Sequence, residues 1–233
     1  MNYKLSTCHL KNMSYQQHNA KKINVCGIGP GNPELIVPEV FRLVAESTLV
    51  VGGSRHLEIF NVSDKETWVL RNNIEQIIET LKTSEHAAIT VLVSGDTGFH
   101  SLLTTLLRHF IPTELNVIPG ISSYQYFFAK LAMTYHDAWI GSLHGMTVDY
   151  VMKVKSNRKT FLLTDSLNSW KQIAMRLSEN GLGECEMYVG NRLSYPDEQI
   201  VFSTANELKE QQHDFTLCSV IIINNMTICN ISY

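Results

Sequence analysis

Short apolar runs alternate with helically spaced segments along the first half of the chain. Apolar runs cover residues 23–26, 49–51, 87–93 and 116–118, as in strands buried on both faces of a parallel sheet. Residues 74–81 keep the apolar spacing of an amphipathic helix. We also expect an edge strand at 68–70, a loop over 52–56, and helices over 102–110 and from Asn32 onward, the last with an apolar face of Val40, Phe41, Val44 and Ala45. This alternation predicts a doubly wound, mostly parallel sheet up to about residue 118.

The second half has a less regular rhythm. Strands are predicted at 138–142, 160–163, 186–189, 199–203 and 217–223, and helices after Ser123 and over 170–177, the latter closed by Gly181. Connections between the last strands are too short for long helices, which favours antiparallel pairing and a mixed sheet. The predicted fold class is therefore α/β, with two α/β domains over 22–118 and 119–233. Residues 1–21 are predicted to be a disordered extension.

Composition narrows the class of protein. A hydrophobic fraction of 44% and a charged fraction of 18% are ordinary for a globular chain. No apolar run reaches the ~18 residues of a membrane helix, and the polar start resembles no signal peptide, so we expect a cytoplasmic protein without a membrane partner. Five cysteines without a C-x-x-C pair suggest reduced thiols. A net charge of −3 gives no general attraction to nucleic acid.

The segment from Gly27 to Pro33 follows the first strand and carries three glycines at alternate positions and two prolines. Its setting suggests a dinucleotide-binding loop, but Asn32 stands where that fingerprint needs a third small residue. Pro30 and Pro33 also lack the backbone N–H groups that cradle phosphate. The loop is therefore of the nucleotide-binding type, with chemistry unsuited to phosphate.

Five loops at the predicted carboxyl ends of strands are rich in Gly, Ser, Thr or Asp: 27–33, 94–98, 119–123, 141–145 and 164–166. In open α/β sheets, ligands bind at this edge. Asp96 can accept hydrogen bonds from ribose hydroxyls or an ammonium group. The Ser122-Ser123 pair fits either a helix cap or a ligand contact, and His144 fits either a structural or a functional role. Hydrolase, phosphate-loop and metal-ligand motifs are absent, so no metal is expected.

Taken in order, six segments resemble the tetrapyrrole (corrin/porphyrin) methylase family. They are 27–31, 51–57, 94–96, 118–123, 142–145 and 190–198, and the likeness extends from residue 22 to about 224. The last two segments are similar to the branch that methylates carbon 5 of a corrinoid, cobalt-precorrin-7. Two positions depart from the family pattern, since Asn32 stands where many relatives have Asp and Thr97 where Pro is common.

The resemblance implies that S-adenosylmethionine (SAM) binds in a cleft between the two domains of a homodimer. Carried over by position, the cofactor contacts fall at Pro30, Ser94, Gly95, Asp96, Ser122, Ser123, Thr164, Asn191 and Leu193. The resemblance also accounts for the prolines of the first loop, because SAM carries no phosphate and needs no backbone N–H groups to bind one.

The implied acceptor carries many carboxylates, so a chain with net charge −3 must supply a local positive patch. Candidates for binding the substrate are Arg55, His56 and Arg192, and His144 is the candidate for taking the proton that leaves carbon 5. The chain ends shortly after its last predicted strand, so we expect a separate protein to act at carbon 15. Alternatives are another acceptor in the same fold (another precorrin, RNA or a protein), a nucleotide-binding oxidoreductase and a non-catalytic binding protein.

Overall fold

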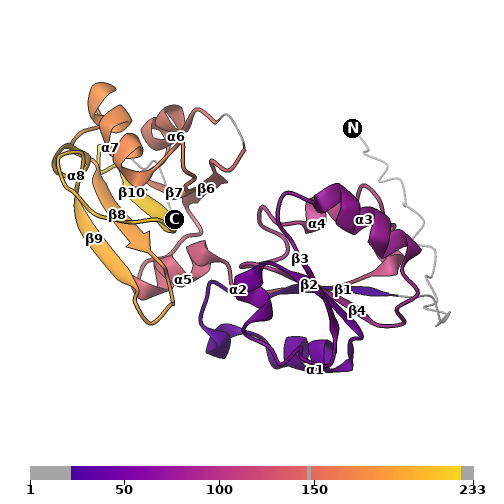
Figure 1. Ribbon diagram of the computed structural model, residues 1–233. Coiled ribbons are helices and arrows are strands. Elements are labelled where there is room, and N and C mark those ends of the chain that lie inside the picture. Colours follow the sequence, from indigo (N-terminus) through magenta and orange to yellow (C-terminus); the bar gives the residue numbers. More distant parts are fainter. Residues whose placement is uncertain (1–21, 146–147, 227–233) are drawn as a thin grey trace, which may run out of the picture.

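A computed structural model describes residues 22–145 and 148–226, and its strands form two five-stranded sheets (Figure 1). The predicted extension over 1–21 lies outside the described residues. The first sheet has the order β3-β2-β4-β1-β5. Its strands are β1 (Ile23–Gly27), β2 (Leu49–Gly52), β3 (Glu66–Val69), β4 (Ile89–Val93) and β5 (Leu115–Ile118). Every neighbouring pair is parallel, so the prediction of a parallel sheet is confirmed, with β4 at its centre and β3 at an edge.

Helices cover both faces of this sheet (Figure 1). Helix α3 (Ile74–Thr83) packs Ile77 and Leu81 against one face, together with alternate strand residues such as Val25. Helix α1 (Pro38–Glu46) packs on the opposite face, against the intervening residues such as Cys26. Residues 22–118 also contain four short helical segments: η1 (Pro33–Leu35), α2 (Ser54–Leu57), α4 (Leu103–Leu106) and η2 (Pro112–Glu114).

Three local predictions for the first half were wrong. Asn32 caps only the short η1, by accepting the Glu34 N–H at 2.9 Å, and α1 begins at Pro38. This start turns Phe41 and Ala45 to the surface and places Leu43 in the core. The helix expected over 102–110 is limited to α4 and flanking turns. The segment after Gly53, expected as a loop, forms α2.

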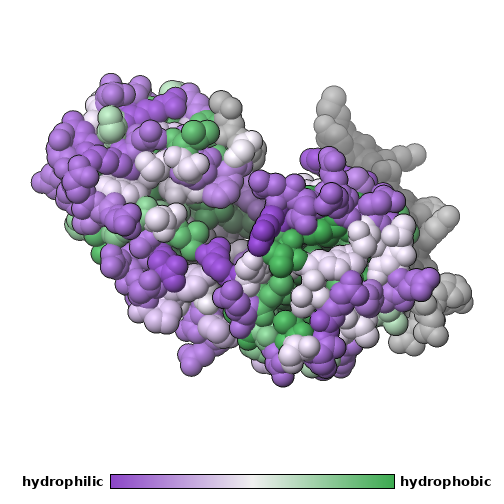
Figure 2. All heavy atoms as spheres, viewed as in Figure 1, coloured by the Kyte–Doolittle hydropathy of each residue, from purple (hydrophilic) through white to green (hydrophobic). Residues whose placement is uncertain are grey.

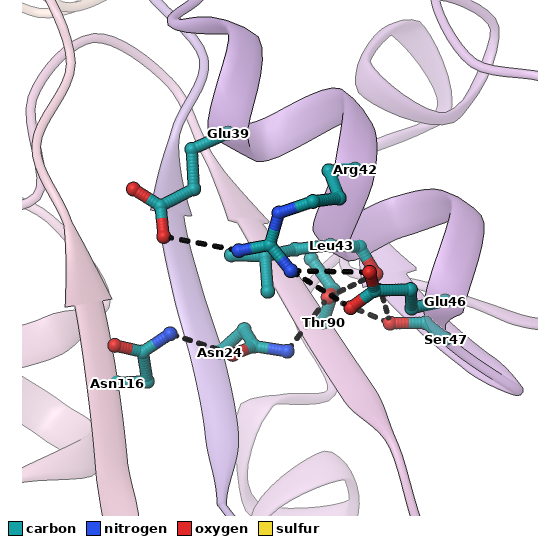
Figure 3. Close-up of polar contacts among 8 residues, drawn as sticks. All are labelled: Asn24, Glu39, Arg42, Leu43, Glu46, Ser47, Thr90 and Asn116. Atoms are coloured by element: carbon teal, nitrogen blue, oxygen red, sulfur yellow. Dashed lines mark hydrogen bonds and ion pairs between the residues drawn. The ribbon is translucent and has the colours of Figure 1, made fainter.

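A polar network crosses the first sheet beneath α1 (Figure 3). Asn116 on β5 donates to Asn24 on β1 at 2.9 Å, and Asn24 donates to Thr90 on β4 at 3.3 Å. The Thr90 hydroxyl lies 2.7 Å from that of Ser47, which also donates to the Leu43 carbonyl at the end of α1. The network satisfies buried polar groups and fixes the register of three strands relative to the helix.

The second sheet is mixed, as predicted, with the order β6-β7-β10-β8-β9. Its strands are β6 (Ala138–Ser142), β7 (Lys159–Leu163), β8 (Glu186–Asn191), β9 (Gln199–Thr204) and β10 (Cys218–Ile223). Only β6 and β7 pair in parallel; the other three pairs are antiparallel. Its helices are α5 (Ser123–Lys130), α6 (Tyr150–Ser156), α7 (Trp170–Glu179) and α8 (Ala205–Leu208), of which α6 and α8 were not predicted.

Helices also cover both faces of the second sheet. Residues of α6, α7 and α8 form a core on one face, with Val151, Ile173 and Leu208 among its members. On the other face, Phe127 and Phe128 of α5 are fully buried. Strands before residue 119 thus belong to one sheet and those after it to the other, while the division into domains at that position stays a prediction. Within 22–145 and 148–226, no helix has both the length and the apolar character that crossing a membrane requires.

Candidate functional site

A cavity of about 320 Å³ lies where the two halves of the chain meet. The molecular surface is hollowed between them (Figure 2). The lining residues are Pro30, Arg55, Ser94, Gly95, Asp96, Phe99, His100, Ser122, Ser123, Ser142, His144, Leu163, Thr164, Leu193, Tyr195, Leu217, Cys218 and Ser219. Most lie at or just beyond the carboxyl ends of strands such as β1, β4, β6 and β7, where open α/β sheets bind ligands.

Three loops that follow strands of the first sheet meet backbone to backbone on one side of the cavity. A Cβ atom on Gly27 would lie 2.7 Å from the Gly120 nitrogen and 2.8 Å from the Gly95 oxygen, so no side chain fits there. Gly29 and Gly95 exchange two backbone hydrogen bonds, of 3.1 and 2.8 Å. The glycines therefore allow strand-end loops from β1, β4 and β5 to form one continuous wall.

The Asp96 carboxylate ties two of these loops together. Oδ2 accepts the Gly98 N–H at 2.9 Å, and Oδ1 accepts the Gly120 N–H at 3.1 Å. Such bonds from backbone amides to an ionised carboxylate are stronger than neutral ones. Asp96 lines the cavity and also holds the shape of its wall, while its predicted contact with the cofactor stays a prediction.

The Ser122-Ser123 pair begins helix α5. The Ser122 hydroxyl accepts the Gln125 N–H at 3.3 Å, while the Gln125 side chain accepts the Ser122 N–H at 2.9 Å, which is a capping box. The side chain of Ser122 is thus committed to the cap. Ser123, one position further, lines the cavity beside it.

The second half supplies the opposite wall. Thr164, after β7, donates from its hydroxyl to the Cys218 carbonyl at 2.8 Å. Asn191 does not line the cavity; its Oδ1 accepts the N–H groups of Thr216 and Leu217 at 3.2 and 3.3 Å, which places Leu217 in the wall. Burial raises the pKa of Cys218 to about 12, so this thiol stays protonated and is no nucleophile.

Of the three cationic candidates, only Arg55 lines the cavity. The prediction of a charge at His56 was wrong, because burial and the neighbouring Arg55 lower its pKa to about 4, which leaves the ring neutral near pH 7. Arg192 points its guanidinium at Asp197, with Nε 2.7 Å from the carboxylate, and does not line the cavity.

Two histidines lie in the cavity wall. His144 is exposed, and its backbone N–H donates to the Ser142 hydroxyl at 3.2 Å. His100, which was not among the predicted site residues, lies in the loop before α4 at φ 48°. Phe99, Ser142 and Tyr195 were also missed as lining residues. Tyr195 had a usable signal, since it lies inside the family-like segment 190–198.

The lining suits a ligand of mixed polarity. Leu163, Leu193 and Leu217 contribute apolar side chains to the lining, and Ser94 and Ser123 contribute side chains with hydroxyl groups. SAM has both kinds of surface, so the residues present fit it. Within the part of the chain that the structure describes, no cluster of three or more His, Cys, Asp or Glu side chains is arranged to hold a metal.

Comparisons with known proteins identify the family of this chain and its relatives. Residues 22–209 match the family model described as Tetrapyrrole (Corrin/Porphyrin) Methylases. A probable cobalt-precorrin-7 C(5)-methyltransferase of Methanocaldococcus jannaschii is 32% identical over 205 residues, covering 84% of this chain and 96% of the relative. The cobalt-precorrin-7 C(5)-methyltransferase of Salmonella typhimurium is 28% identical over 202 residues, covering 87% of this chain and 98% of the relative.

Solved structures share the fold. A precorrin-6Y methylase of cobalamin biosynthesis from Archaeoglobus fulgidus superposes with a TM-score of 0.67 at 20% identity, over 88% of this chain and 98% of that one. A uroporphyrin-III C-methyltransferase from Thermus thermophilus, solved with S-adenosylhomocysteine, gives 0.66 at 19% identity, over 86% and 91% of the two chains. The predicted two-sheet α/β fold is confirmed by these likenesses.

Proposed function

Because the chain belongs to the tetrapyrrole (corrin/porphyrin) methylase family, we propose that it transfers the methyl group of SAM to carbon 5 of a cobalt-corrinoid precursor, cobalt-precorrin-7. The observation that carries the proposal is the cavity between the two sheets, whose wall combines the Pro30 loop, the Asp96 loop and the Ser122-Ser123 turn. The C(5)-methyltransferase relatives, matched over nearly their whole length, support carbon 5 as the position methylated.

Bound SAM supplies a methyl group already activated on a sulfonium. The chain therefore needs no nucleophile, and its own contribution is to align the two reactants and exclude water. The closely packed loops around Gly27, Gly95 and Gly120 give a rigid wall for that alignment. Asp96 suits the cofactor's polar end rather than the sulfonium, since a carboxylate held close to the sulfur would stabilise the ground state more than the transition state.

Proposed roles at the acceptor follow from charge and position. Arg55 is the cation that meets a substrate carboxylate, because it lines the cavity and a guanidinium can bind a carboxylate through two hydrogen bonds. His144 takes at a ring nitrogen the proton that leaves carbon 5. His56 and Arg192 have no such role in this proposal, since the first is neutral and the second pairs with Asp197.

We further propose a cytoplasmic homodimer that acts beside a separate protein for the chemistry at carbon 15. Light scattering of the purified chain tests the homodimer. A mass twice that of the 26.4 kDa chain would support it, and the monomer mass would contradict it.

The test of function is incubation with SAM and cobalt-precorrin-7, followed by mass spectrometry. We expect one added methyl group and the formation of S-adenosylhomocysteine. His144→Gln should lower kcat by about 10²-fold while leaving S-adenosylhomocysteine affinity unchanged. Calorimetry that finds tight NAD(P)H binding and no S-adenosylhomocysteine binding would overturn the proposal in favour of an oxidoreductase. If RNA or protein is methylated instead of the corrinoid, the assignment of SAM as cofactor stands and the assignment of the acceptor is wrong.

A further inference from the structure

The segment Leu193–Glu198 leaves the second sheet after β8 and reaches the first loop of the chain. The Ser194 hydroxyl accepts the Asn32 backbone N–H at 2.9 Å, across 162 positions of sequence. Ser194 is 8% exposed and Asn32 is half-buried, so this hydrogen bond is partly shielded from water. It joins the second half of the chain directly to the loop that carries Pro30.

Tyr195 makes two further contacts to the first half. Its ring packs on Gly31 so closely that a Cβ atom there would lie 2.8 Å from the ring carbon Cζ. Its hydroxyl accepts a long hydrogen bond of 3.5 Å from Arg55 Nη1. The Arg192 guanidinium lies 4.6 Å from the ring centroid, a cation–π distance that holds the ring in place.

This segment keeps an unusual backbone conformation. Arg192 and Ser194 have φ values of 50° and 68°, in the left-handed region that residues with side chains rarely adopt. Glu198 accepts the Ser194 N–H at 2.7 Å and pairs with Lys130 of α5 at 2.9 Å, while Arg192 pairs with Asp197. Such strain persists only where surrounding contacts fix it, and it is found mainly at functional sites.

Pro30, Arg55 and Tyr195 all line the cavity, so any movement of Leu193–Glu198 would reshape its wall. We propose that Ser194 and Tyr195 are positioning residues: Ser194 holds the Pro30 loop against the cofactor, and the Tyr195 hydroxyl aims Arg55 at the acceptor. This inference rests on the proposed function for the identity of the two ligands, the cofactor at the Pro30 loop and the acceptor at Arg55. The contacts themselves can be tested without it.

Ser194→Gly is the sharpest variant, because it removes the hydroxyl and relieves the left-handed φ at the same time. It should fold at least as well as the wild type. We expect the Asn32 amide to exchange with solvent about tenfold faster by NMR. The dissociation constant for S-adenosylhomocysteine should rise about threefold to tenfold, as expected for one lost hydrogen bond. Unchanged exchange and unchanged affinity would overturn the role of Ser194.

Tyr195→Phe keeps the ring on Gly31 and removes only the bond to Arg55. We expect KM for the corrinoid to rise about threefold or more, with kcat and S-adenosylhomocysteine affinity unchanged. Tyr135→Phe is the matched control, since it removes a hydroxyl from a ring packed on Tyr124 and Phe128. Equal KM values for the Tyr195 variant and the wild type would overturn this assignment. If the wild type itself neither binds S-adenosylhomocysteine nor methylates the corrinoid, the proposed function fails, while the Asn32 exchange still tests the contact.

Discussion

The His56 ring packs beside Gly52 and Gly53, where its Nδ1 atom is buried without a hydrogen-bond partner within the described chain. Burial and the Arg55 charge lower the pKa of His56 to about 4, from 6.5 for an ordinary histidine. Between these two pH values the unfolded chain binds the proton that the folded chain excludes. The free energy of unfolding therefore falls as pH drops from 6.5 toward 4.

We predict that His56 accounts for about 1 to 3 kcal/mol of that loss. His56→Leu should show a weaker decrease of stability between pH 7.5 and pH 4.5, measured by urea unfolding. His109→Leu is the control, because His109 is exposed and its replacement should leave the wild-type pH dependence intact. Identical pH dependence in the His56 variant and the wild type would mean that the ring is solvated and able to carry charge.

At the scale of elements, the close meeting of three strand-end loops yields a second prediction. A Cβ atom on Gly120 would lie 2.7 Å from the Gly27 carbonyl carbon and 2.9 Å from its Cα atom. Both neighbours are backbone atoms of the interior strand β1, so neither can move aside cheaply.

Gly120→Ala should therefore destabilise the fold by about 2 kcal/mol or more, measured by urea unfolding. Gly53→Ala is the control, since Gly53 has φ −63° and its added Cβ would meet no atom closer than 3.4 Å. The control should change stability by less than about 1 kcal/mol. Equal stability of the two variants would show that the loops do not pack as tightly as described.

The strands were easier to predict than the helices. The apolar run of β4, at the centre of the first sheet, is buried along its whole length, as its near-continuous apolar sequence predicts. The helix expected from Asn32 failed because Pro38 interrupts it. A proline disfavours helical backbone at the residue before it, and Val37 is extended, so η1 ends and α1 begins anew at Pro38. The leucines near residue 106 match a helical period, but the chain turns there after a single helical turn, which leaves Leu107 exposed.

At the scale of the whole molecule, the position of the site was predictable and several of its side chains were not. Loops at carboxyl strand ends gather at one edge of a sheet, and that rule grouped Pro30, Asp96 and Ser123 from the sequence. Contacts between the halves, such as Ser194 with Asn32, depend on how two sheets face each other. The local sequence carries no signal for that contact. The neutral state of His56 likewise depends mainly on burial, with the Arg55 charge adding to it, and burial is a property of the folded chain.

Because both halves line the cavity, a ligand bound there should stabilise the folded molecule as a whole. At a concentration of 100 times its dissociation constant, S-adenosylhomocysteine should add about 2.7 kcal/mol and raise Tm by about 5 to 10 °C. Pro30→Trp fills the cavity from a partly exposed loop position, so it should abolish this shift while leaving the Tm of the free protein nearly unchanged. Pro112→Trp, at an exposed position outside the cavity, should keep the full shift. A Pro30 variant that keeps the ligand-induced rise in Tm would mean that the cofactor binds elsewhere. A variant whose Tm without ligand falls strongly would mean that the loop is needed for folding, and not only for shaping the ligand site.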